Sequence, residues 1–315
     1  MTHRIDVHHH IVPPRWLAEE GERMSATAVN FDIVAKWTPA MSLESMDRNG
    51  VATAVTSVST VIIKPDEPAA AHSLARDCNE FAARLSIDHP GRFGVFALLP
   101  LPHVKECLRE IEYCADVLKV DGFKLQTSYK DTWLGDPAFA PVFDELNRRK
   151  AVVFVHPGAP DCCMNMLPGI HPPLLEYPFD TTRTITSLLF SGTLSRCQNI
   201  RFIFSHGGGT IPMLAHRIGT LAQKNRELSA RLPGGAIAQL QKLFFDVVMV
   251  TNKPAMSALL ALATASKLLF GSDTPYLRIE ETASELAGLG LGADELLAIE
   301  CQNALALMPS LARRT

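Results

Sequence analysis

Several apolar segments of this 315-residue chain end in residues that can bind a metal ion. The first reads DVHHH from residue 6, and because a strand alternates its side chains, His8 and His10 would share one face. Later segments read FVHPG, FSHGGG and LFGSDTPY, and they place His156, His206 and Asp273 at the end of an apolar run. Imidazole nitrogens and carboxylate oxygens in such positions are ligands that divalent metal ions prefer.

These residues are informative as a set rather than singly. One histidine alone is more often hydrogen-bonded in the core or at the surface, and we interpret six others in that way: His3, His72, His89, His103, His171 and His216. Buried imidazoles and a carboxylate without partners cost several kcal/mol, and a divalent cation removes that cost by accepting their lone pairs. The four strand ends therefore predict a metal ion. Zn²⁺ suits the nitrogen-rich set, and Mn²⁺ is compatible with it.

Short apolar runs alternate with amphipathic segments along the chain and must hold these residues in place. Runs such as AVVFV and IRFIF are typical of parallel strands covered on both faces. We predict eight strands, at residues 4–10, 53–59, 92–99, 122–127, 151–156, 200–206, 243–249 and 267–273. We predict helices at residues 68–88, 103–117, 137–149, 180–196, 210–228 and 254–264.

This alternation favours an α/β fold of the TIM type, a (β/α)₈ barrel, in which the carboxyl ends of the strands meet at the functional face. A doubly wound parallel sheet is the alternative, because alternation alone does not show closure. Two stretches interrupt the pattern, 13–40 after the first strand and 158–178, which is rich in Pro and Gly. We expect one domain over residues 1–315 in which the insertion at 13–40 caps the site, and surface decoration is the other interpretation.

Composition excludes several classes of protein. The chain has 30 basic and 33 acidic residues without a basic stripe, which argues against a nucleic-acid partner. No apolar run approaches the roughly 18 residues of a membrane span, and the N-terminus lacks the apolar stretch of a signal peptide. The seven cysteines form no CxxC pair and are typical of reduced thiols. We therefore expect a cytoplasmic protein with a small-molecule substrate.

The stretches IDVHHHIVPP, FSHGGG, GSDTPY and QNALAL resemble the amidohydrolase-2 branch of the amidohydrolase superfamily over almost the whole chain. That branch includes decarboxylases similar to aminocarboxymuconate semialdehyde decarboxylase. The segments KWTPAMSLESMDRNGV, DGFKLQTSY and WLGDPAF are most similar to its 6-methylsalicylate decarboxylase-like group. The resemblance implies a distorted barrel and a metal-dependent, non-oxidative decarboxylase of a small ortho-hydroxy aromatic or related unsaturated carboxylic acid.

The resemblance also implies roles for single residues. His8, His10, His156 and Asp273 would bind one metal ion. His206 would stand beside the site as an acid or base, and the proton donor would be either His206 or Asp273. A hydrolase of an amide, a lactone or a C–C bond is the alternative function, because the same site would serve it.

Three further residues enter through the resemblance as substrate-binding candidates. Arg217, eleven residues after His206, matches an arginine that reaches the neighbouring subunit's site, which implies a homodimer or a higher oligomer. Trp37 matches a tryptophan near a second carboxylate-binding arginine that this chain lacks at the same place. Lys124 lies on the fourth predicted strand, where binuclear relatives carry a metal-bridging carboxylated lysine. We expect it to contact substrate in a mononuclear site, with the binuclear arrangement as the alternative.

Overall fold

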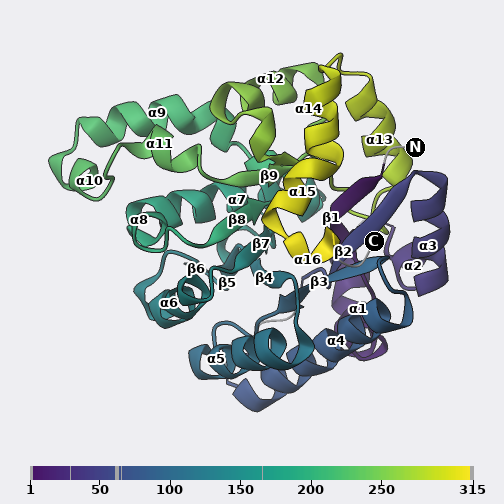
Figure 1. Cartoon of the computed structure of the whole chain (residues 1–315). Helices are drawn as coiled ribbons and strands as arrows, with labels where there is room; N and C mark the ends of the chain where they lie inside the picture. Colours follow the sequence, from purple (N-terminus) through teal and green to yellow (C-terminus); the bar gives the residue numbers. More distant parts are fainter. Residues whose placement is uncertain (1–2, 29, 61–63, 65, 165, 313–315) are drawn as a thin grey trace.

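The computed structural model describes residues 3–28, 30–60, 64, 66–164 and 166–312. Its main sheet has eight parallel strands that neighbour one another in chain order and form a nearly closed barrel (Figure 1). The strands are β1 (Arg4–His10), β2 (Val51–Ser57), β3 (Phe93–Leu98), β4 (Gly122–Gln126), β7 (Val152–His156), β8 (Arg201–Phe204), β9 (Phe244–Asp246) and β10 (Leu268–Leu269). The predicted barrel and the places of its eight strands are confirmed.

The barrel closes between β1 and the residues that follow β10. The Val7 N–H donates to the Phe270 carbonyl at 3.0 Å, and the Asp273 N–H donates to the His8 carbonyl at 2.7 Å. The strand predicted over 267–273 is shorter than expected, because the chain leaves extended geometry and Asp273 adopts a φ of +61°.

Helices cover the outside of the barrel. The longer ones are α3 (Pro39–Arg48), α4 (Pro68–Asp88), α5 (Val104–Tyr113), α6 (Ala140–Arg148), α7 (Pro172–Phe190), α9 (Ile211–Gln223), α12 (Lys253–Leu262) and α13 (Ile279–Ala287). Many begin at a proline. Proline has no N–H group, and this costs little in the first turn because the N–H groups there have no partner within the helix. α1 (Pro14–Thr27) is a further long helix. The shorter helices are α2 (Phe31–Val34), α8 (Thr193–Arg196), α10 (Arg226–Ala230), α11 (Ala236–Leu240), α14 (Ala293–Leu297), α15 (Asn303–Leu307) and α16 (Pro309–Ala312). A small antiparallel hairpin joins β5 (Ser128–Tyr129) to β6 (Thr132–Trp133).

The helix predicted from residue 180 begins eight residues earlier, at Pro172. The prediction treated the Pro-rich stretch up to Pro178 as a loop, but two prolines open the helix and Pro178 lies inside it. The Thr181 and Thr182 hydroxyls donate to the carbonyls of Tyr177 and Pro178 within this helix. The N-terminal half of α7 is thereby placed against the site.

The barrel interior is apolar and is closed at its lower end by the C-terminal helices. Side chains of the strands pack there against α15 and α16, which cross the barrel in Figure 1. The members of this cluster include Ile5, Val7, Val55, Phe96, Phe154, Ile203, Leu307 and Leu311. The functional groups are therefore confined to the opposite end.

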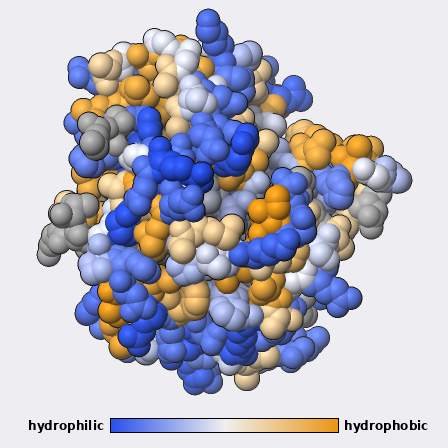
Figure 2. All heavy atoms as spheres, turned by 90° about the vertical axis from the view of Figure 1, so that its right-hand side faces the viewer, coloured by the Kyte–Doolittle hydropathy of each residue, from blue (hydrophilic) through white to orange (hydrophobic). Residues whose placement is uncertain are grey.

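No helix among the described residues is long and apolar enough to cross a membrane. Figure 2 shows one face of the molecule, on which hydrophilic and hydrophobic residues are interspersed.

Candidate metal centre

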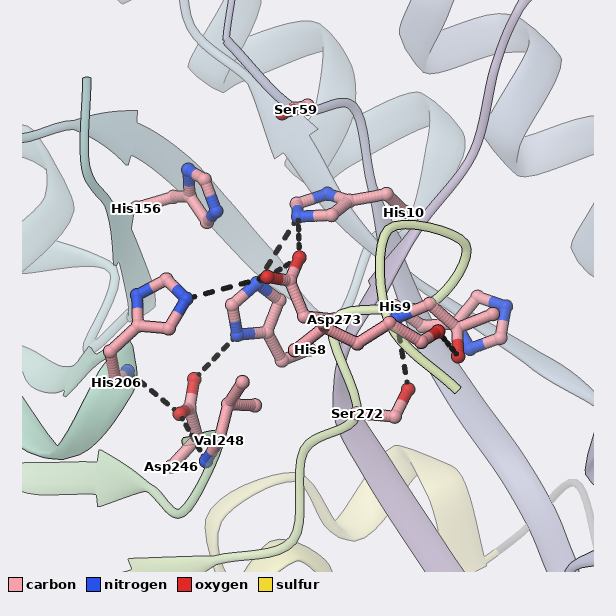
Figure 3. Close-up of polar contacts among 12 residues, drawn as sticks. His8, His9, His10, Ser59, His156, His206, Asp246, Val248, Ser272 and Asp273 are labelled. Atoms are coloured by element: carbon pink, nitrogen blue, oxygen red, sulfur yellow. Dashed lines mark hydrogen bonds and ion pairs between the residues drawn. The ribbon is translucent and has the colours of Figure 1, made fainter. Parts of the chain in front are cut away.

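Four of the residues singled out in the sequence meet at the upper end of the barrel. His8 and His10 come from β1, His156 ends β7, and Asp273 follows β10. One ligand atom from each of the four lies within 4.8 Å of the others (Figure 3). The three histidines are buried, and the Asp273 side chain is 14% exposed.

The outer nitrogen of each imidazole is held by an acceptor. His8 Nδ1 lies 2.8 Å from Asp246 Oδ2, His10 Nδ1 lies 3.3 Å from the Ser57 carbonyl, and His156 Nδ1 lies 2.9 Å from the Pro157 carbonyl. A carboxylate or carbonyl accepts only, so we assign the proton to Nδ1 in each ring. Each Nε2 then carries a lone pair, as a neutral imidazole ligand requires.

The Nε2 atoms point toward one another and toward Asp273. His8 Nε2 lies 3.1 Å from His10 Nε2, and Asp273 Oδ1 lies 3.3 Å and 3.1 Å from these two nitrogens. Two buried lone pairs at this distance repel unless a positive charge stands between them. The donor set therefore fits a divalent cation.

The pKa values give the same indication. Burial lowers the pKa of His8, but the Asp273 and Asp246 carboxylates outweigh it and raise that pKa to about 10. Burial lowers the pKa of His10 to about 4 and that of His156 well below its usual value. Burial raises the pKa of Asp273, but His8 and the other imidazoles hold it well below the usual range. The two carboxylates thus favour one positive charge at this point of the cluster, which a bound cation can supply in place of a proton.

Asp246 is a functional candidate that the sequence analysis missed. It ends β9, is fully buried, and binds the His8 ring through Oδ2. Its Oδ1 accepts the N–H groups of His206 and Val248 at 2.8 Å and 3.1 Å. The available signal was an aspartate inside the apolar run LFFDVVM, at the end of a predicted strand.

His206 lies beside the ligand set rather than in it. Its Nε2 is 3.4 Å from Asp273 Oδ2, and its Nδ1 is buried without a hydrogen-bond partner among the described residues. The next three residues are glycines with positive φ, and a Cβ at Gly208 would come within 2.5 Å of the Phe245 ring. The turn that sets His206 beside the cluster therefore requires glycine.

A cavity of about 230 Å³ opens above these residues. It is small relative to the roughly 300–1,000 Å³ of typical ligand pockets, so it suits a small molecule. His156, His206 and Asp273 lie at its polar end, with Ser59, Tyr177 and Tyr276 near them. Most of the remaining wall is apolar: Met24, Ala28, Pro173, Leu174, Met249 and Leu277. Met24 and Ala28 belong to the segment 13–40, which was expected to cap the site.

The three substrate-binding candidates lie outside this wall. Lys124 is fully buried on β4, and its Nζ donates to the carbonyl of Ser59 at 2.6 Å. Trp37 is also buried, and its indole N–H donates to Ser42 Oγ at 2.8 Å. Arg217 is exposed on α9 and is not among the residues that line this chain's cavity.

Comparison with known proteins gives one family and several relatives. The family model described as amidohydrolase (Amidohydro_2) matches residues 5–309. The chain is 35% identical to the decarboxylase yanB of Aspergillus niger, over 97% of this chain and 87% of that protein. It is also 35% identical to the 6-methylsalicylic acid decarboxylase acuB of Aspergillus aculeatus, over 98% of this chain and 97% of that protein.

Among solved structures, the fold is similar to that of a dihydroxybenzoic acid decarboxylase from Polaromonas sp. JS666, solved with bound manganese and the inhibitor 2-nitroresorcinol. The TM-score is 0.83 at 18% identity, and the alignment covers 98% of this chain and 97% of that chain.

Proposed function

Because the chain belongs to the amidohydrolase family, we propose that it is a metal-dependent, non-oxidative decarboxylase of a small ortho-hydroxy aromatic acid. The observation that carries the proposal is that ligand atoms of three histidines and one carboxylate lie within 4.8 Å of one another beside a small cavity. Relatives 35% identical over nearly the whole chain are named decarboxylases, and one of them acts on 6-methylsalicylic acid.

We assign His8, His10, His156 and Asp273 as ligands of one divalent ion. Three imidazoles and one carboxylate suit Zn²⁺, and Mn²⁺, which the Polaromonas structure contains, is the alternative. The bound ion supplies positive charge that stabilises the substrate oxygen next to the departing carboxylate. Metal analysis separates the two ions, and two equivalents per chain would overturn the mononuclear assignment.

The cavity orients the substrate by its two unlike ends. A carboxylate and its ortho oxygen face the ligand cluster, and the ring lies against the apolar wall that includes Met24, Leu174 and Met249. Lys124 acts indirectly in this arrangement, because it holds the Ser59 carbonyl while Ser59 lines the cavity. Trp37 has no comparable link to the cavity wall, because its hydrogen bond to Ser42 leads to His9.

Decarboxylation needs a proton at the ring carbon that carries the carboxylate. We assign its delivery to His206, which borders the cavity and faces Asp273 Oδ2. Protonation of that carbon breaks aromaticity. The C–C bond to the carboxylate then breaks, its electron pair returns to the ring, and CO₂ leaves. Asp273 is a poor donor by comparison, because the surrounding imidazoles keep its pKa well below the usual range.

Arg217 is the substrate-binding candidate that implicates a second subunit. It lies on the exposed face of α9 between Met213 and Leu221, whose side chains are 75% and 50% exposed. Figure 1 places α9, α10 and α11 together at one side of the molecule. An exposed apolar face with a central arginine suits a homodimer in which Arg217 binds the substrate carboxylate of the neighbouring site.

The seven cysteines are free thiols, which suits the reducing conditions of the cytoplasm, where we place the protein.

The test is a product assay. Protein reconstituted with Zn²⁺ or Mn²⁺ is incubated with 6-methylsalicylate, salicylate and dihydroxybenzoates, and CO₂ and the decarboxylated phenol are quantified. A lactone and amide panel run alongside tests for hydrolysis. Turnover of the latter panel alone, with uptake of water, would overturn the proposal.

A further inference from the structure

The carboxylate of Asp6 accepts hydrogen bonds from two of the three segments that supply the proposed metal ligands, the strand that carries His8 and the turn that carries Asp273. Its Oδ1 accepts the N–H of His8 at 3.0 Å and the N–H of Ser272 at 3.1 Å. Its Oδ2 accepts the Ser272 hydroxyl at 2.6 Å and His9 Nδ1–H at 3.0 Å. Asp6, His9 and Ser272 are fully buried, so water does not compete for these bonds.

These bonds hold Ser272, the neighbour of Asp273, whose backbone is strained. Asp273 has a φ of +61°, a left-handed conformation that non-glycine residues rarely adopt. The Asp273 N–H donates to the His8 carbonyl at 2.7 Å, and the Thr274 N–H donates to Ser272 Oγ at 3.2 Å. Ser272 is therefore the point at which Asp6 can fix the direction of the Asp273 side chain.

A second chain of bonds holds Asp6 itself. The Trp37 indole N–H donates to Ser42 Oγ, so the Ser42 hydroxyl is left to donate to His9 Nε2 at 2.8 Å. His9 then donates from Nδ1 to Asp6, and every polar atom in the series has one consistent role. This series connects α3 and the residues before it to the barrel strand that carries His8 and His10.

The series Ser42–His9–Asp6 contains the residue types of a hydrolytic triad, but its geometry excludes that use. Ser42 is 1% exposed and His9 is buried completely. The indole of Trp37 covers the Ser42 oxygen, and Ser42 is absent from the cavity wall. A substrate has no access to this oxygen, so the series positions other groups.

We propose that Asp6 is a positioning residue that, through Ser272, holds Asp273 in its left-handed, ligand-forming conformation. The proposal rests on the metal site proposed above and goes beyond it, because it assigns a function to residues that touch neither metal nor substrate. Removing a residue that orients a metal ligand by hydrogen bonds typically weakens metal affinity by about 10- to 100-fold.

The experiment measures binding of Co²⁺ and Mn²⁺ to wild type, Asp6→Asn and Ser272→Ala, by competition with a chelating dye and by the visible absorption of bound Co²⁺. Ser272→Ala removes one hydroxyl only and decides the question if Asp6→Asn fails to fold. Asp121→Asn is the matched control, because Asp121 also accepts a backbone N–H, of Val95 at 2.9 Å, and a serine hydroxyl, of Ser310 at 2.6 Å.

We expect both variants to bind Co²⁺ and Mn²⁺ about 10- to 100-fold more weakly and to shift the Co²⁺ absorption, while Asp121→Asn keeps the wild-type values. Wild-type affinity and absorption in Asp6→Asn and Ser272→Ala would overturn this inference but not the proposed function. Equal weakening in Asp121→Asn would also overturn it, because the effect would then be general destabilisation. A wild-type protein that binds neither ion would overturn the proposed function, and the inference with it.

Discussion

His8 Nδ1 and Asp246 Oδ2 are 2.8 Å apart, and both side chains are completely buried. The carboxylate fixes the ring so that Nε2 faces the other ligands, and it raises the basicity of that nitrogen. The same carboxylate holds the backbone of His206 through its second oxygen. One aspartate therefore sets both a proposed metal ligand and the proposed proton donor.

Replacing Asp246 by asparagine should weaken metal binding by about 10- to 100-fold, because the amide cannot reproduce both acceptor roles. The measurement is a dye-competition titration with Zn²⁺. Unchanged affinity would show that the His8 ring is oriented without this carboxylate.

Replacing His206 by asparagine should lower kcat by about 10²- to 10⁴-fold while the metal content stays at one equivalent, because the variant loses proton delivery but none of the four ligands. Turnover in D₂O with mass analysis of the phenol measures transfer to the ring carbon. Near-normal turnover and deuterium incorporation would move the donor role to Asp273.

Replacing Arg217 by alanine should raise KM by about tenfold or more and leave metal content unchanged, because a charged hydrogen bond to the carboxylate is lost. The exposed Arg226 on α10 provides the control, Arg226→Ala, which should behave as wild type. Sedimentation of Met213→Asp tests the interface, and an active wild-type monomer would contradict the shared site.

Lys124 should make the free energy of unfolding depend on pH. Burial lowers the pKa of Lys124 to about 7, whereas the unfolded chain has the usual value of 10.5. Between these values the unfolded state binds one more proton, so stability should rise with pH, by up to about 1.4 kcal/mol per pH unit. Urea unfolding from pH 7.5 to 9 should show this rise in wild type and lose it in Lys124→Met. Equal slopes in the two proteins would mean that the buried amine keeps its proton.

Removal of the metal ion should lower the melting temperature, because an ion that binds only the folded state stabilises it by about 2.7 kcal/mol at one hundred times its Kd. Differential scanning calorimetry with and without a chelator measures this. Identical melting curves would indicate that no ion is bound.

The sequence was sufficient for the barrel and for the clustering of the four proposed metal ligands, because both depend on local patterns. Each parallel strand reads as an apolar run, and His156 stands where such a run ends. The same rule located Asp273, although its strand is shorter than predicted.

The hydrogen bonds that join Asp6, His9 and Ser42 could not be predicted from the sequence. The contact between His9 and Ser42 joins residues 33 positions apart, and nothing in either segment marks it. The Pro-rich start of α7 was misassigned for a different reason, because Pro172 and Pro173 occupy the first helical positions and only Pro178 interrupts the helix.

The helices at the lower end of the barrel affect how substrate enters and product leaves. α15 and α16 pack beneath Phe154, whose ring lies 5.1 Å from that of His8, so an apolar cluster and not the cavity lies below the reacting groups. Substrate, phenol and CO₂ then pass through the same cavity, and a phenol that is still bound there delays binding of the next substrate molecule. The enzyme's own product should accordingly compete with fresh acid for entry.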